Sequence, residues 1–206
     1  CLEPLYLWLL RGYEVITVSL STKNDLLRYG FQADQIHIIP EGIEIDRAPD
    51  IRALAKYDRP TLLSLGSIRA MKRTKHQIEA FTLAKQTLPN LQMKIAGDAQ
   101  SVYGSEVLRM IAKSPYRTDI EFLGRVSKER KIELMQKSHL ILVTSVKEGW
   151  GLIVTEAASQ GTPAVVYDVD GLRDSVTHGV TGLIARENTK NGLAEAIVRL
   201  LKNPEE

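Results

Sequence analysis

The sequence predicts an α/β fold in which a parallel sheet is flanked by helices. Three observations support this prediction. From Pro60 onward, short apolar runs alternate with longer amphipathic segments, glycines mark several of the turns, and His139–Thr144 is almost entirely apolar. Central strands of a parallel sheet are buried on both faces and have such continuous apolar sequences. Repeated strand–helix units with short turns are typical of an open parallel sheet.

The first 50 residues contain one strand–helix–strand unit. Glu14–Ser19 and Gln35–Ile39 suit strands, and Lys23–Tyr29 between them suits a helix. A single unit of this kind cannot cover its own sheet, so we expect it to belong to a larger neighbouring domain. The polar stretch from Pro40 to Arg59 is expected to be a connector.

The second part of the chain supplies the Rossmann-like sheet. Its strand candidates are short apolar runs, several of which end beside a glycine: Thr61–Leu65, Gln92–Ala96, Asp119–Leu123, His139–Thr144, Ala164–Tyr167 and Gly182–Ala185. Its helix candidates are amphipathic: Lys75–Leu88, Glu106–Lys113, Lys128–Lys137, Leu152–Gln160 and Gly192–Lys202. In the first of these helices Ile78, Phe81 and Ala84 share one face, as a core-facing helix requires.

The turns after the strands are expected to form the functional edge of the sheet. Right-handed crossovers place the carboxyl ends of all parallel strands on one edge, and ligands bind along that edge. We therefore expect Gly66, Gly97 and Gly124 to converge there with the loops Glu148–Gly151 and Asp168–Gly171.

The composition excludes several classes of protein. Of the 206 residues, 44% are hydrophobic and 25% charged, which is typical of a globular protein. A formal net charge of +2 does not indicate a nucleic-acid partner, because such proteins carry a concentrated basic stripe. The single cysteine, Cys1, excludes an internal disulfide and a thiolate metal site. We expect a cytoplasmic protein. The apolar run Leu5–Leu10 is interpreted as a packed helix, with peripheral contact to the cytoplasmic membrane face as the alternative.

The loop that follows the apolar strand has features of an anion-binding site. Gly149 and Gly151 flank Trp150 at a strand-to-helix junction, where glycine lets the backbone approach a ligand closely. The free amides of Leu152 and Ile153 at the start of the next helix suit an anionic group such as a diphosphate.

Two carboxylates bracket this junction. Glu148 precedes the loop, and Glu156 lies about one turn into the helix. Carboxylates on both sides of a phosphate cradle suit partners that carry hydroxyl groups, such as a sugar and a ribose. The alternative is a pair of solvated acids, since charged residues are mostly exposed. Their position beside two glycines favours the binding site.

The segment Gly66–His76 is a second candidate for anion binding. It follows a strand and concentrates Arg69, Lys72, Arg73 and Lys75. A cation at the carboxyl end of a strand can pair with a diphosphate and stabilise it as a leaving group. The alternative is a solvated basic turn.

These segments resemble one known family. Glu148–Val166 is similar to the E-x7-E signature of the retaining, GT-B-fold glycosyltransferases of group 1, the family 4 type. The basic segment resembles the phosphate loop of that family, with Lys72 at its lysine. Val18–Asp25 and Ile38–Glu44 are similar to the segment that leads into the linker, and Gly179–Ile184 resembles a turn near the family's end. The resemblance covers almost the whole chain.

The resemblance implies a role for each site residue. Glu148 and Lys72 are the implied catalytic residues, with Glu148 on the hydroxyls of the transferred sugar and Lys72 on the diphosphate. Glu156 is implied to hold the ribose. The implied donor-binding residues are Gly66, Ser67, Arg69, Gly97, Arg125, Val126, Lys131, Gly149, Trp150, Gly151, Leu152, Ile153 and Glu156. The implied substrate is a UDP-, GDP- or ADP-sugar, bound without a metal or other cofactor.

The chain departs from the family pattern at two places. Ser67 stands where the family usually has arginine, so Arg69 is a candidate for that role. Asp170-Gly171 stands where a Gly-Gly pair is common.

The resemblance also implies a domain organisation. Residues 1–48 are expected to be the last part of an N-terminal acceptor domain plus linker, and residues 49–206 the C-terminal nucleotide-sugar-binding domain. The expected partners are the nucleotide-sugar donor, the missing N-terminal domain and a glycan, lipid or small-molecule acceptor.

Other functions have weaker support. Asp168-Val-Asp170 matches a three-residue metal-binding pattern, which alone specifies little, and we expect no metal there. The four histidines show no ligand or triad spacing, and His139 is interpreted as a packing residue. A GT-B-fold nucleotide-sugar epimerase remains an enzyme alternative, and a nucleotide-binding module without turnover is the non-enzyme alternative.

Overall fold

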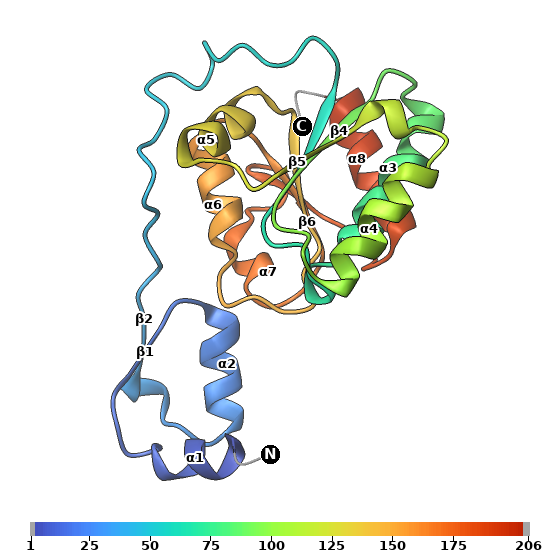
Figure 1. Cartoon of the computed structure of the whole chain (residues 1–206). Helices are drawn as coiled ribbons and strands as arrows, with labels where there is room; N and C mark the ends of the chain where they lie inside the picture. The colour runs from blue at the N-terminus through green and yellow to red at the C-terminus, as the bar shows by residue number, and fades with distance from the viewer. Residues whose placement is uncertain (1–2, 204–206) are drawn as a thin grey trace.

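The computed structural model describes residues 3–203. A small N-terminal unit is joined by a long extended segment to a larger α/β unit (Figure 1). The small unit consists of α1 (Glu3–Leu9), β1 (Val15–Thr17), α2 (Leu20–Arg28), a short 3₁₀ helix (Ala33–Gln35) and β2 (Ile36–Ile38). Its two strands pair in parallel, which confirms the predicted strand–helix–strand unit. Cys1 lies outside the described residues.

The larger unit contains a parallel sheet of six strands in the order β5-β4-β3-β6-β7-β8. The strands are β3 (Thr61–Leu65), β4 (Gln92–Ala96), β5 (Ile120–Gly124), β6 (Leu140–Val143), β7 (Ala164–Val166) and β8 (Gly182–Ile184). The helices are α3 (Thr74–Thr87), α4 (Val102–Lys113), α5 (Lys128–Lys137), α6 (Leu152–Ser159), α7 (Leu172–Ser175) and α8 (Lys190–Lys202). Helices α3, α4 and α8 cover one face, and α5, α6 and α7 cover the other (Figure 1). The predicted fold class is confirmed.

The core consists of two apolar layers, one on each face of the sheet. Successive residues of a strand point to opposite faces, so Leu62 packs in the layer under α3, α4 and α8, and Leu63 packs in the other layer. All four residues of β6 are buried, as predicted for a central parallel strand. Burial on both faces therefore fixes β6 at the centre of the unit.

Several helices differ from their predicted bounds because of local capping. The helix predicted from Glu106 begins at Val102, since Ser101 Oγ accepts a hydrogen bond from the amide of Gly104 at 3.0 Å. Helix α7 was not predicted, because only four residues form it. Caps depend on one side chain and one amide, which apolar periodicity does not report.

The connector between the two units lies against the α/β unit. Ile45 and Ala48 are buried, and the amide of Ala48 donates to the carbonyl of Ser159 at 3.1 Å. The side chain of Gln160 donates to the carbonyl of Asp46 at 2.8 Å. The predicted connector is therefore held against the end of α6.

The N-terminal unit exposes large apolar side chains. Trp8 in α1 and Ile16 in β1 are 56% and 69% exposed. The apolar run interpreted as a helix does lie largely within α1, but its side chains Tyr6, Trp8 and Leu9 are exposed. Within residues 3–203, no helix is long and apolar enough to span a bilayer.

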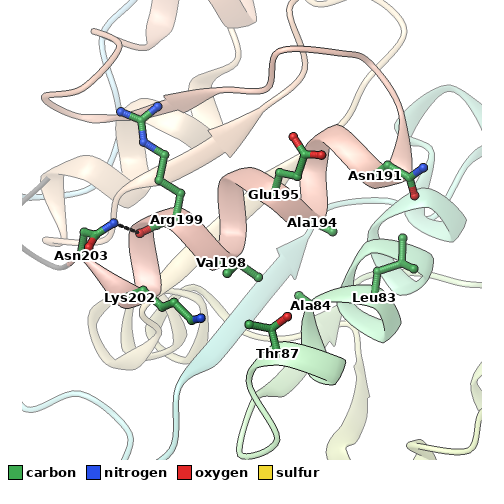
Figure 2. A pocket seen from close by; sticks show the side chains of 10 residues that line it. All are labelled: Leu83, Ala84, Thr87, Asn191, Ala194, Glu195, Val198, Arg199, Lys202 and Asn203. Carbon is green, nitrogen blue, oxygen red and sulfur yellow. Dashed lines mark hydrogen bonds between the residues drawn. The ribbon is translucent and has the colours of Figure 1, made fainter.

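A groove of about 560 Å³ runs between α3 and α8. Figure 2 shows its walls, with Leu83 and Thr87 from α3 and Ala194 and Val198 from α8. None of the sequence-predicted site residues lines this groove, which lies between two covering helices rather than at the strand ends.

The glycine turns after β3, β4 and β5 meet at the carboxyl edge of the sheet, as predicted. The amide of Gly66 donates to the carbonyl of Ala96 at 3.0 Å, and that of Gly97 donates to the carbonyl of Gly124 at 2.8 Å. A Cβ atom placed on Gly97 would lie 1.9 Å from the carbonyl oxygen of Gly66. This approach excludes any side chain at position 97.

We expect Gly97→Ala to lower the free energy of unfolding by about 3 kcal/mol, because the methyl group collides with rigid backbone. Urea denaturation measures this change. Gly42→Ala is the control, since a Cβ on Gly42 meets nothing within 4 Å. Equal stability of both variants would contradict the close approach.

Candidate functional site

The basic segment after β3 is tied to the end of β6. Thr144 Oγ1 donates to the carbonyl of Lys72 at 2.8 Å and accepts from Gln77 Nε2 at 2.9 Å. The amide of Val146 donates to the carbonyl of Met71 at 2.8 Å. Thr144 and Gln77 are buried, and sequence reasoning did not find either. The sequence signal that could have identified Thr144 is its hydroxyl group at the end of an otherwise apolar strand.

This anchor brings Lys72 and Glu148 together. Lys72 Nζ forms an ion pair with Glu148 Oε1, and Ser145 Oγ donates to the same oxygen at 2.6 Å. The two charged side chains are 28% and 18% exposed. The predicted catalytic pair thus forms one half-buried group at the carboxyl edge of the sheet.

The other cations of the basic segment do not join this group. Arg69 is exposed, and its Nε donates to Ser67 Oγ at 3.0 Å. Lys75 pairs with Glu106 of α4 at 2.5 Å. The hydrogen bond and charge of Lys75 lower the pKa of Glu106. Lys75 is therefore paired with a carboxylate of α4 rather than with Glu148.

Arg73 adopts an unusual backbone conformation beside Lys72. Among residues 3–203 it is the only non-glycine residue with positive φ, at 51°. It separates the short 3₁₀ helix Ala70–Lys72 from α3, and its guanidinium lies 5.7 Å from the ring centroid of Tyr167. This left-handed residue turns the chain so that Lys72 faces the β6–α6 loop while α3 starts immediately afterwards.

The start of α6 has an open N-terminus, as predicted. Gly151 has φ 85°, and no side chain caps the helix. Glycine is favoured here by the positive φ, and a Cβ on Gly151 would lie 2.8 Å from Leu172 Cδ2 and displace that side chain. The first amides of a helix, here those of Leu152 and Ile153, have no intrahelical acceptor. The side chain of Trp150 is anchored to α6 by a 3.0 Å hydrogen bond from its Nε1 to Thr155 Oγ1.

The second carboxylate pairs with the lysine that the sequence singled out on α5. Lys131 Nζ lies 2.6 Å from Glu156 Oε1, with the side chains 25% and 13% exposed. Val126 packs against the apolar layer under α5, α6 and α7, and Arg125 is exposed just after β5. Lys131 and Glu156 are therefore brought together, whereas Arg125 remains at the rim.

A small polar cavity of about 30 Å³ lies between these loops. Gly66, Ser67, Lys72, Ser145 and Ile153 are among the residues that line it. The space is of the order of one water molecule. The cavity connects the predicted phosphate loop directly to the start of α6.

The loop after β7 completes the edge. The amide of Glu148 donates to the carbonyl of Asp170 at 3.3 Å, and a Cβ on Gly171 would lie 2.2 Å from the carbonyl oxygen of Glu148. The predicted convergence of this loop with the β6–α6 loop is confirmed. Arg173 donates to Asp168 at 2.6 Å and to Asp170 at 3.1 Å, so one protein cation pairs with both carboxylates of the three-residue pattern.

The described part of the chain shows no cluster of three or more histidine, cysteine, aspartate or glutamate side chains arranged to hold a metal ion. The hydrogen bond to Asp168 raises the pKa of Arg173. The Asp-Val-Asp pattern therefore forms an ion-pair cluster with Arg173.

Comparison with known proteins identifies the family. Residues 46–206 match the family model of the glycosyl transferases group 1, and the chain belongs to this family. The family assignment does not favour the epimerase alternative.

Named relatives are consistent with this family. A glycogen synthase of Mycobacterium tuberculosis (strain H37Rv) is 26% identical over 199 residues, which cover 96% of this chain and 48% of that protein. A D-inositol 3-phosphate glycosyltransferase of Nocardia farcinica is 28% identical over 186 residues, covering 84% of this chain and 41% of that protein. The chain thus spans about half the length of these curated relatives or less.

Solved structures confirm the fold class, that of the GT-B glycosyltransferases. A sucrose-phosphate synthase from Thermosynechococcus elongatus is similar with a TM-score of 0.76 and 27% identity, over 93% of this chain and 49% of that one. Anabaena HepE in complex with UDP-glucose is similar with a TM-score of 0.75 and 22% identity, over 93% of this chain and 54% of that one.

We expect Thr144→Val to lower the free energy of unfolding by about 2 kcal/mol, because the carbonyl of Lys72 loses its side-chain donor and Gln77 Nε2 keeps only its longer hydrogen bond, to the carbonyl of Leu142 at 3.3 Å. Chemical denaturation measures the loss. Thr144→Ser keeps the hydroxyl group and should lose less. If valine were tolerated as well as serine, the anchoring role of the hydroxyl would be refuted.

Proposed function

We propose that this chain is the donor-binding half of a retaining glycosyltransferase, which transfers a sugar from a nucleoside-diphosphate sugar to an acceptor. The observation that carries the proposal is the Lys72–Glu148 pair beside the uncapped start of α6. A cation, free helix amides and a carboxylate then lie within one site. These are the groups needed for a diphosphate attached to a hydroxyl-rich sugar.

The diphosphate would lie across the N-terminus of α6. The amides of Leu152 and Ile153 would donate to its oxygens, and Lys72 Nζ would offset their charge. When the bond between the anomeric carbon and the phosphate oxygen breaks, the oxygen keeps the electron pair. A fixed cation and fixed amides stabilise the charge that develops there, and they need little reorganisation to do so.

The sugar would lie beside Glu148. Glu148 Oε1 accepts hydrogen bonds from Lys72 Nζ and Ser145 Oγ. Sugar hydroxyl groups can donate to the same carboxylate, while Lys72 turns toward the phosphates. An ionised carboxylate accepts several hydrogen bonds, so it can bind two hydroxyls at once. The ligand would thus replace a protein ion pair with charge-assisted contacts of its own.

The ribose would lie on the opposite side of the phosphates, against Glu156. Lys131 holds one oxygen of Glu156, which fixes the orientation of the carboxylate toward a pair of hydroxyls. Gly124 ends β5, Arg125 and Val126 follow it, and these three residues would border the base. This arrangement assigns the two carboxylates to different parts of one donor.

We propose that the phosphates are bound without a metal ion. Lys72 and the α6 amides supply the positive charge, and Arg173 already occupies the carboxylates of Asp168 and Asp170. HepE was solved with UDP-glucose, which supports a UDP-sugar as the first donor to test. Because the chain spans about half the length of its relatives, we place the acceptor site in the other half of the enzyme.

We expect Glu156→Ala to lower the affinities for UDP and for UDP-glucose about equally, by roughly tenfold, because the substitution removes charge-assisted hydrogen bonds to the ribose. Glu148→Ala should leave UDP affinity within about twofold and abolish the extra affinity contributed by glucose. Isothermal titration calorimetry with both ligands measures these effects. Glu129→Ala, on the exposed start of α5, is the matched control. Equal losses for both ligands in both variants would contradict the division of roles.

We expect the 206-residue chain to bind a nucleoside diphosphate but to transfer sugar slowly, since the acceptor half is needed to close the site. Melting temperatures are measured with UDP, GDP and ADP sugars in the presence of EDTA. The sugar nucleotide with the correct base should raise the melting temperature by roughly 5–10 °C at a ligand concentration of about 100 times its Kd. Any product should keep the donor's anomeric configuration by NMR. An absolute requirement for Mg²⁺ or Mn²⁺ would refute metal-free binding of the phosphates. A product of inverted configuration would refute the retaining mechanism, and rapid transfer by this chain would refute the need for the acceptor half.

A further inference from the structure

A large cavity lies at the edge of the sheet opposite Glu148 and Lys72. Its volume is about 630 Å³. Leu140 at the start of β6, Pro163 just before β7 and Gly182 at the start of β8 line it. These are the amino ends of the strands, whereas the site described above occupies their carboxyl ends. The two sites therefore lie on opposite edges of one sheet.

The cavity contains a half-buried lysine with no counter-charge. Lys56 Nζ donates to the carbonyl of Gly161 at 2.8 Å and to Thr162 Oγ1 at 2.9 Å. Across the described residues, no carboxylate forms an ion pair with Lys56. Burial lowers its pKa to about 8. A charge removed from water without a partner is costly, so an anion bound here would relieve an existing penalty.

A histidine in the same cavity supplies a second donor. His139 Nδ1 accepts a hydrogen bond from the amide of Thr61 at 3.1 Å, so the hydrogen of the neutral ring is on Nε2. Within residues 3–203, Nε2 has no hydrogen-bond partner. Burial, and then the charge of Lys56, lower the pKa of His139. The ring is therefore neutral near pH 7, and the sequence-based interpretation of His139 as a packing residue is incomplete.

The rest of the cavity wall is mainly apolar. Leu200 and Leu201 of α8 form one side, and Ile51 and Val180, both exposed apolar residues, form parts of the rim. Among the residues that the structure describes, Lys56 and His139 are the only titratable side chains in the lining. Ligand pockets of this size commonly combine apolar walls with a few converging polar groups.

We propose that this cavity binds a small amphipathic carboxylate, an organic acid with an apolar body. Its carboxylate accepts hydrogen bonds from Lys56 Nζ and His139 Nε2, and its apolar part lies against Leu200 and Leu201. The lining carries one positive charge near neutral pH, which matches a singly charged carboxylate better than a doubly charged phosphate monoester.

Calorimetry of the 206-residue chain with octanoate tests the proposal. Octanoate should bind at one saturable site, and octanol and acetate should bind at least tenfold more weakly, since each lacks one half of the recognised chemistry. Saturating UDP should leave octanoate affinity unchanged, because the two sites lie on opposite edges. Competition with UDP, equal affinity for octanol, or tighter binding of octyl phosphate would overturn the proposal.

Substitutions in the connector provide a second test of octanoate binding. Lys56→Met should weaken octanoate at least tenfold, Lys56→Arg should retain most of the affinity, and Arg52→Met is the control because it removes an exposed cation of the same segment. Melting temperatures without ligand show whether each variant is folded. Unchanged octanoate affinity in folded Lys56→Met would refute the site.

The pH dependence gives an independent readout in the unmodified chain. Octanoate is already ionised at pH 7, so the charge of Lys56 decides the affinity above that value. Because the pKa of Lys56 is about 8, affinity should fall above about pH 8, by up to tenfold per pH unit. The Lys56→Arg variant should keep its affinity over the same range. A flat profile in the unmodified chain would overturn the role of Lys56.

Discussion

Close contact between backbone segments at the carboxyl edge of the sheet is the constraint on which the site depends. Gly97 lies against the carbonyl of Gly66, and Gly171 lies against that of Glu148, at distances that leave no room for a Cβ atom. Loops from distant parts of the chain are thereby locked together through rigid atoms rather than flexible side chains. Lys72 and Glu148 can face each other only because these contacts fix the loops that carry them.

The two edges of the sheet hold charge in opposite ways. At the carboxyl edge Glu148 pairs with Lys72 and Glu156 pairs with Lys131, so the two charges of each pair offset each other. Partly exposed pairs contribute little to stability, and their value here is geometric, because each pair holds a carboxylate in a fixed orientation. At the amino edge Lys56 has hydrogen bonds but no counter-charge among residues 3–203. Under the two proposals, a ligand would replace a lysine–carboxylate pair at the carboxyl edge and would pair with Lys56 at the amino edge.

The sequence alone was sufficient for the fold class and for the convergence of the loops that carry the candidate site. Continuous apolar residues in β6 predicted a doubly buried strand, and the glycine-flanked Trp150 predicted the start of α6; both are confirmed. Such features are local, since a strand's burial or a helix's open end is determined by a few neighbouring residues. The early start of α4 was missed because one capping bond sets it, and α7 was missed because four residues are too few to show helical periodicity.

Tertiary structure decided which charged and polar groups meet. The basic segment alone did not show that Lys75 pairs with α4, that Gln77 and Thr144 hold the segment in place, or that Lys56 and His139 share a cavity. Thr144 lies 72 positions from the carbonyl that it binds, and Lys56 lies 106 from Thr162. Sequence periodicity reports which side of an element is buried. Contacts between distant positions depend on how the elements pack in three dimensions, and only the folded chain determines that packing.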